Sequence, residues 1–159
     1  VNTMSQNIPM PYRIQKDFGE FPFAHRQPKH EGHCAKIHGH NWRFIVTLGA
    51  TRLDDNGFVF DFGQFKELKE LLTEVFDHTL LLQTNDPLLE HIQGSLGDVA
   101  NIVLMDSVSC EGIAQYVYSQ VVYFLLHNGH ADRVTVISVT VTEDAKNSAT
   151  YTMENLVTS

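Results

Sequence analysis

Four neighbouring residues of this chain could do chemistry together: Cys34, His38, Gly39 and His40, with His25 a short distance before them. Side chains at alternate positions of a β-strand point to the same side, so His38 and His40 could bind one metal ion from one face. Gly39 has no side chain and lets the backbone approach another group closely. With His25 as a third imidazole, the set would make a zinc site with one open position, the arrangement of catalytic zinc.

Other histidines compete for the third ligand position. His30 and His33 are candidates, but they fall in a loop that contains Pro and Gly, where their side chains are less well aimed than that of His25. Zinc is the expected metal, because imidazole nitrogen suits it and the site needs no redox role. A single histidine, taken alone, is more often just a solvated or hydrogen-bonded side chain.

Several other residues have both a plain and a functional interpretation. Cys34 is either a small buried apolar residue or, in its Lys- and His-rich loop, a reactive thiolate favoured by nearby positive charge. Asp77 and His78 are either a helix end with a histidine favoured by the dipole, or a carboxylate that orients an imidazole for proton transfer. Glu143 is either the solvated tip of an apolar strand or a carboxylate that accepts the paired N–H donors of an aminopyrimidine ring.

Composition limits the class of protein. The 159 residues carry a formal net charge of −8, which argues against nucleic acid as a partner. No apolar run is long enough to span a bilayer, and the first residues lack the pattern of a signal peptide. Two cysteines, Cys34 and Cys110, do not make a disulfide framework. We therefore expect a cytoplasmic protein with a single domain over residues 1–159.

Apolar periodicity predicts the elements that must position these residues. We expect two strands, one with a bend at Gly19 and one beginning near the HGH motif, then two amphipathic helices and a C-terminal hairpin. The pattern over residues 88–105 is the least clear and indicates an extended segment with some helix. The expected ranges are 12–23 and 42–48 for the first strands, 63–76 and about 110–128 for the helices, and 134–142 and 149–153 for the hairpin.

The order β-β-α-α-β-β predicts an α+β fold. Its expected form is a four-stranded antiparallel sheet with two helices packed on one face. Such a small sheet leaves its edges open, which favours oligomerisation through them.

Six motifs then occur in the order of one known family, and together they resemble 6-pyruvoyl-tetrahydropterin synthases over about residues 12–153. The resemblance implies the tunnelling fold (T-fold), in which trimers stack into hexamers and sites form between subunits. It implies a homo-hexamer, a small pterin triphosphate as substrate, and neither nucleic acid nor a membrane as partner. The motifs are FAHR (23–26), CAKIHGH (34–40), FDFGQFK (60–66), FDHTLL (76–81), SCE (109–111) and VTVTED (139–144).

The resemblance also implies a role for each matching residue. Cys34 matches the family's catalytic general base, and Asp77 and His78 match its second proton-relay pair. Glu143 matches the carboxylate that anchors the pterin ring, and Glu111 matches an acidic position that helps to bind it. Ser109 stands where the family commonly has Thr. The residues that match the family's zinc ligands are His25, His38 and His40.

The implied activity is that of a zinc-dependent lyase. It would convert 7,8-dihydroneopterin triphosphate to 6-carboxy-5,6,7,8-tetrahydropterin, with loss of triphosphate and acetaldehyde, as in queuosine biosynthesis. The short gap between Cys34 and His38 is similar to this branch, since the biopterin branch usually has a longer one. By proximity in sequence, the cations expected to meet the triphosphate are Arg26, Lys29, Lys36 and His30.

Two alternatives stay open. One is a 6-pyruvoyl-tetrahydropterin synthase, which eliminates triphosphate only. The other is a non-catalytic zinc-binding module, in which Cys34 and three histidines close a structural site. Val108 and Cys110, which replace a usual Pro and Ser, and the long connection over residues 83–105 leave the substrate preference open.

Overall fold

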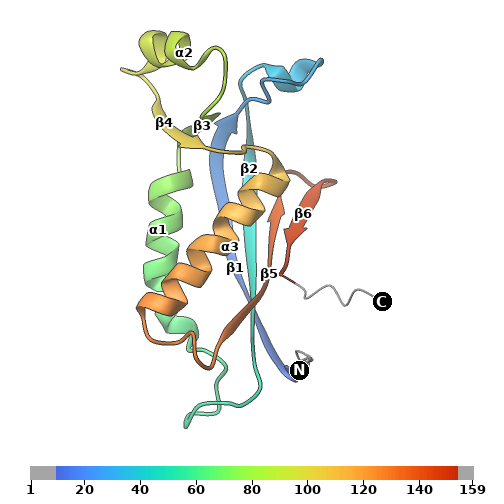
Figure 1. Ribbon diagram of the computed structural model, residues 1–159, viewed down its shortest axis with the longest axis vertical. Helices are drawn as coiled ribbons and strands as arrows, with labels where there is room; N and C mark the ends of the chain where they lie inside the picture. The colour runs from blue at the N-terminus through green and yellow to red at the C-terminus, as the bar shows by residue number, and fades with distance from the viewer. Residues whose placement is uncertain (1–9, 154–159) are drawn as a thin grey trace, which may run out of the picture.

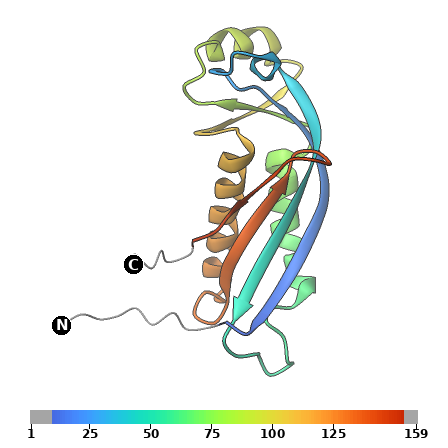
Figure 2. The same cartoon turned by 90° about the vertical axis from the view of Figure 1, so that its right-hand side faces the viewer.

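The computed structural model describes residues 10–153. Its centre is a six-stranded sheet in the order β4-β3-β1-β2-β5-β6, and helices α1 and α3 cover one face of it (Figures 1 and 2). The strands are β1 (Tyr12–His25), β2 (His38–Ala50), β3 (Thr79–Gln83), β4 (Asn101–Met105), β5 (Thr135–Thr142) and β6 (Ser148–Tyr151). The helices are α1 (Lys66–Phe76), α2 (Leu89–Leu96) and α3 (Cys110–His127), with short 3₁₀ turns η1 (His33–Ala35) and η2 (Phe62–Phe65).

The long antiparallel pair of β1 and β2 carries the metal candidates. Its register runs from Tyr12 opposite Ala50 to His25 opposite His38, so the chemistry lies at one end of the pair. The expected bend is confirmed, because the register shifts between Asp17 and Glu20 around Gly19, whose φ is +79°.

The expected four-stranded antiparallel sheet with two helices is wrong in part. The sheet is mixed, because β3 pairs parallel with both β1 and β4, and α2 adds a third helix between them. The observed order is therefore β-β-α-β-α-β-α-β-β. Residues 79–82 are all buried, so β3 lacks the alternation that predicts a strand exposed on one face.

The main core lies between the sheet and helices α1 and α3. The inward face of β2 contributes Trp42, Phe44, Val46 and Leu48, all fully buried. The predicted helix over 63–76 begins as a 3₁₀ turn, because the Asp61 side chain accepts a hydrogen bond from the Gly63 N–H. No helix in the described range is long and apolar enough to cross a membrane.

A smaller apolar cluster holds the excursion after β3. Leu80 and Leu82 of β3 and Ile92 of α2 are its buried members. Figures 1 and 2 place α2 at the same end of the molecule as the loop that joins β1 to β2. The stretch over residues 88–105, which the sequence left least defined, thus begins at the end of the molecule where β1 and β2 are joined.

Candidate metal centre and its cavity

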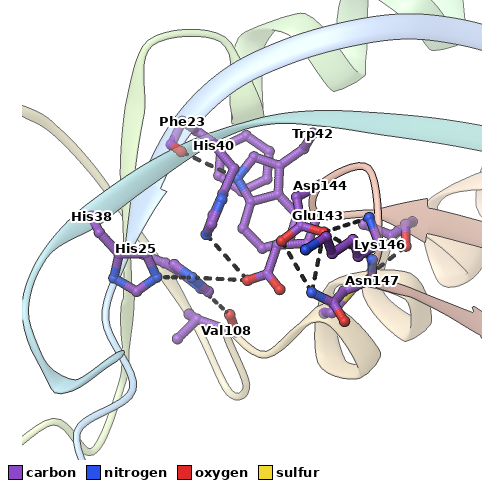
Figure 3. A network of polar contacts seen from close by, with 12 residues as sticks. Phe23, His25, His38, His40, Trp42, Val108, Glu143, Asp144, Lys146 and Asn147 are labelled. Atoms are coloured by element: carbon purple, nitrogen blue, oxygen red, sulfur yellow. Dashed lines mark hydrogen bonds and ion pairs between the residues drawn. The ribbon is translucent and has the colours of Figure 1, made fainter. Parts of the chain in front are cut away.

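Three imidazoles and one carboxylate converge at the end of the β1–β2 pair (Figure 3). His25 is the last residue of β1, while His38 and His40 lie at alternate positions at the start of β2. Glu143 reaches them from the end of β5, and one potential ligand atom of each of the four residues lies within 4.8 Å of the others. The alternation predicted for His38 and His40 is confirmed by this geometry.

Backbone carbonyls determine which nitrogens of two rings carry the proton. His25 Nδ1 lies 2.7 Å from the Val108 carbonyl oxygen, and His38 Nδ1 lies 2.7 Å from that of Lys36. A carbonyl can only accept, so Nδ1 is the donor in both rings. In the neutral form of each ring Nε2 is then a lone pair, and the two Nε2 atoms lie 3.1 Å apart. Burial of the ring lowers the pKa of His25 to about 4, against the opposing effect of the Val108 hydrogen bond, so the ring is neutral near pH 7.

The electron-rich atoms between these rings fit a cation. Glu143 Oε1 lies 3.3 Å from His40 Nε2 and 3.6 Å from His25 Nε2. His40 Nε2 is buried and has no hydrogen-bond partner among the described residues. Because buried polar atoms are almost always satisfied, an orphaned imidazole nitrogen that faces two lone pairs and a carboxylate fits a metal ion.

Trp42 supports the rings from behind. Its side chain is fully buried, its indole stands at 89° to the rings of both His25 and His40, and its Nε1 donates to the Phe23 carbonyl at 3.1 Å. Packing of this kind fixes the ring orientations, as the outer groups of metal sites commonly do.

A cavity of about 470 Å³ opens beside the imidazoles. This volume lies within the range of cavities that bind small organic ligands. Seven residues proposed from the sequence meet at it: His25, His30, His38, Cys34, Ser109, Glu111 and Glu143. Five others that the sequence analysis did not assign to the site complete the lining: Gln27, Cys110, Lys146, Asn147 and Ser148.

Cys34 lines this cavity but does not belong to the ligand cluster of three imidazoles and Glu143. The other cysteine, Cys110, is half-buried, and burial raises the pKa of its thiol to about 11. Its Sγ points to the Val141 carbonyl at 3.3 Å. Cys34 is therefore the thiol better placed to react.

Ser109 opens α3 at the edge of the cavity. Its hydroxyl accepts a hydrogen bond from the Gly112 N–H at 3.0 Å, which makes Ser109 the N-cap of this helix. The preceding carbonyl, that of Val108, holds His25, so one turn both begins the helix and orients a candidate ligand.

Asp77 and His78 do not line this cavity. They are hydrogen-bonded to each other, with 3.0 Å between His78 Nδ1 and Asp77 Oδ1, but the His78 side chain is 80% exposed. The backbone of His78 is in the left-handed region with φ of 57°, held by an N–H donated to the Pro22 carbonyl at 2.8 Å. The expected contact between Asp77 and His78 is present, and neither side chain lines the cavity that contains Cys34.

Arg26 is not available as the expected contact for a triphosphate. It is buried, and its guanidinium is paired with the Asp86 carboxylate. Lys146 is the only Lys or Arg side chain among the residues that line the cavity. It lies in the β5–β6 turn, where the Asp144 carboxylate accepts from the N–H groups of Lys146 and Asn147. The Asp-x-x-Asn pattern directly after Glu143 was the available signal for this turn.

Comparison with known proteins agrees with this fold. The family model described as 6-pyruvoyl tetrahydropterin synthase matches residues 13–154. A 6-carboxy-5,6,7,8-tetrahydropterin synthase of Rickettsia conorii is 38% identical over 68 residues, which are 42% of this chain and 49% of that protein. The chain thus spans about half the length of that relative. The match to the protein of the same name from Aquifex aeolicus is longer, 27% identical over 124 residues and 76% of each chain. A probable enzyme of that name from Halobacterium salinarum is 31% identical over 76% of this chain and 73% of its own.

Two solved structures share the fold. An uncharacterized protein from Wolinella succinogenes superposes with a TM-score of 0.77 at 23% identity, covering 90% of this chain and 98% of that one. A 6-pyruvoyltetrahydropterin synthase from Plasmodium vivax gives a TM-score of 0.67 at 21% identity, covering 88% and 96%. These likenesses confirm the expected α+β fold, with the sheet corrected to six strands.

Proposed function

Because the chain belongs to the 6-pyruvoyl tetrahydropterin synthase family, we propose that it is a zinc-dependent lyase acting on 7,8-dihydroneopterin triphosphate. The proposed reaction consumes one water molecule and gives 6-carboxy-5,6,7,8-tetrahydropterin, acetaldehyde and triphosphate. The Rickettsia, Aquifex and Halobacterium relatives are named for the same carboxy product. The observation that carries the proposal is the convergence of three imidazoles on one point beside a cavity that also contains Cys34.

In this proposal His25, His38 and His40 hold the zinc ion. When bound there, zinc supplies a Lewis acid that polarises the side-chain oxygens of the substrate. The Nδ1–H groups that His25 and His38 donate to carbonyls keep both rings in the tautomer that presents Nε2.

Protein side chains supply the base, bind the pterin ring and bind the leaving group. Cys34, as the thiolate, takes a proton from the substrate side chain on the cavity side. Glu143 and Glu111 accept the N–H donors of the pterin ring, and Ser109 keeps Glu111 at the start of α3. Lys146 and His30 both line the cavity, and we assign them to bind the leaving triphosphate.

Asp77 and His78 act as the second proton-relay pair, in a site completed by another copy of the chain. The support is that the pair is exposed and lies outside the cavity of its own chain. We propose a homo-oligomer with sites between subunits, of the hexameric kind that the family resemblance implies.

The non-catalytic alternative has less support. The structural zinc site expected from the sequence uses Cys34 as the fourth ligand, and Cys34 is not part of the ligand cluster. The 6-pyruvoyl product remains the competing enzymatic outcome, and the Plasmodium vivax protein is named for that activity.

The test is product analysis. Zinc-loaded protein is incubated with 7,8-dihydroneopterin triphosphate, with Cys34→Ala as the matched control, and the products are identified by mass spectrometry. We expect the carboxy product with acetaldehyde from the native chain and none from the variant. A pyruvoyl product would move the protein to the other branch, and turnover that survives in Cys34→Ala would remove Cys34 as the base.

A further inference from the structure

A buried ion pair next to the site has no part in the function described so far. Arg26 follows His25 directly, and its Nε and Nη2 donate to the two carboxylate oxygens of Asp86 at 2.6 and 2.9 Å. The Asp86 side chain is fully buried and that of Arg26 is 10% exposed. A two-pronged, solvent-excluded contact of this kind fixes orientation as well as position.

The same guanidinium reaches the loop that carries the reactive thiol. Arg26 Nη1 donates to the Ala35 carbonyl at 2.7 Å. The next residue, Gln27, donates its N–H to the Cys34 carbonyl at 2.8 Å. The peptide groups on both sides of Ala35 are thus held by the two residues that follow His25.

Asp86 is in turn held by the connecting segment between β3 and β4, which contains α2. Its Oδ1 accepts the Leu88 N–H at 2.9 Å, and its own N–H donates to the Gln83 carbonyl at 3.0 Å. The apolar cluster of Leu80, Leu82 and Ile92 anchors α2 directly after this turn. A continuous set of contacts therefore links α2 to the Cys34 loop through one guanidinium.

We propose that Arg26 and Asp86 are positioning residues that hold Cys34 at the cavity, beside the imidazole of His25. The inference deepens the proposed function and rests on Cys34 as its base. Stability alone is a weaker explanation, because buried ion pairs are often no more stabilising than apolar replacements. A pair kept only for stability would also not need the third contact to Ala35.

Arg26→Lys is the variant that separates these explanations. Lysine keeps a positive charge for Asp86, but one ammonium group cannot reproduce three donors on three separate nitrogens. We expect kcat to fall by about 10- to 100-fold, as small misplacements of a reacting group do, with KM and zinc content nearly unchanged. We also expect the rate of Cys34 alkylation by iodoacetamide, followed by peptide mass spectrometry, to change by several-fold, because the loop is released.

Arg133→Lys is the matched control. Arg133 also donates to three backbone carbonyls, those of Arg52, Phe58 and Val59, but it does so just before β5, away from the site. We expect this variant to lose stability without a change in kcat or in Cys34 alkylation. Asp86→Asn serves as the second test variant if Arg26→Lys does not fold.

Two results would overturn the inference. One is an unchanged kcat and an unchanged rate of Cys34 alkylation in folded Arg26→Lys. The other is an equal loss of kcat in Arg26→Lys and Arg133→Lys that follows their melting temperatures. The alkylation rate needs no turnover. It therefore tests the placement of Cys34 even if the native chain proves inactive on the pterin substrate, and the two failures are distinguishable.

Discussion

Backbone carbonyls, rather than neighbouring side chains, determine the chemistry of the imidazoles at this site. Val108 and Lys36 each take an Nδ1–H, so the Nε2 atoms of His25 and His38 are left as bare lone pairs. Glu143 adds negative charge at 3.3 Å from His40 Nε2. Its carboxylate could serve as a metal ligand or as the anchor of a pterin ring, and a single substitution distinguishes these roles.

Glu143→Gln keeps the size of the side chain and removes its charge. If Glu143 binds the ring, zinc content stays at the native level, because three imidazoles remain, while KM rises. A lost hydrogen bond to a charged group is worth about 1.5–3 kcal/mol, or roughly 10- to 100-fold in KM. Steady-state kinetics and metal analysis check both quantities, and loss of zinc in this variant would make Glu143 a metal ligand instead.

His78 adopts a conformation that most side chains avoid. A non-glycine residue at φ near 57° carries a cost of about 1–2 kcal/mol. We expect the free energy of unfolding of His78→Gly to lie within about 1 kcal/mol of the native value. Relief of the backbone strain in the folded state offsets the greater freedom of glycine in the unfolded chain. Turnover should fall by about 10²- to 10⁴-fold, as on removal of a general acid or base.

Urea unfolding and kcat measure the two effects of His78→Gly separately. His78→Ala is the comparison, because it removes the imidazole without relieving the strain. Native turnover in His78→Gly would show that the strained residue has no role in proton transfer.

At the scale of elements, prediction succeeded where a segment has one apolar face. Leu68, Leu72 and Phe76 recur at helical spacing, and α1 forms there with these residues buried. The alternation from Trp42 to Leu48 likewise predicted β2. In β3 the residues from Thr79 to Leu82 are all buried, so no period distinguished a strand from the end of the preceding helix.

The candidate site could be predicted from the sequence only where its residues are close together in the chain. His38 and His40 share a strand, so local spacing was enough to pair them. Contacts between distant segments were not predictable, because sequence spacing says nothing about the approach of Asp86 to Arg26 or of Lys146 to the cavity. The interpretation of Arg26 as a triphosphate contact failed for this reason.

The Arg26–Asp86 pair also makes the stability of its elements depend on pH. The hydrogen bonds from Arg26 lower the pKa of Asp86 below its ordinary value of 3.8. The stabilisation is therefore fully present above pH 3.8 and is lost as the pH falls through the lower folded-state pKa. We expect Asp86→Asn to reduce the free energy of unfolding by about 3 kcal/mol at neutral pH, because it leaves a buried charge unpaired.

Urea titrations of the native chain and Asp86→Asn over the acidic range measure this effect. The difference in free energy of unfolding between the two proteins should shrink in the most acidic samples, where Asp86 of the native chain is protonated in both the folded and unfolded states. A difference that stays constant with pH would mean that the ionised pair is not its source.

At the scale of the whole molecule, the residues proposed for one reaction are divided between two regions. Cys34 lines the cavity beside the imidazoles, while His78 is exposed outside it. The sheet has two edge strands, β4 and β6, through which copies could associate. We infer that a functional site combines Cys34 of one copy with His78 of another.

Complementation tests this inference. Cys34→Ala and His78→Ala should each be inactive alone. In mixed oligomers with random assembly, about a quarter of the sites would combine an intact Cys34 with an intact His78 from a neighbour. We expect co-expressed variants to recover activity in that proportion, while mixed oligomers without activity would place both residues in the same chain.

In the proposed site, three imidazoles of this chain hold a zinc ion, and Cys34 is not a ligand. The most direct test of this arrangement is the zinc content of the purified native chain, Cys34→Ala and His38→Ala, measured by elemental analysis after equal zinc loading. We expect one zinc per chain in the native protein and in Cys34→Ala, and a large loss of zinc in His38→Ala. Zinc that is absent from the native chain, or that disappears with Cys34, would contradict this arrangement.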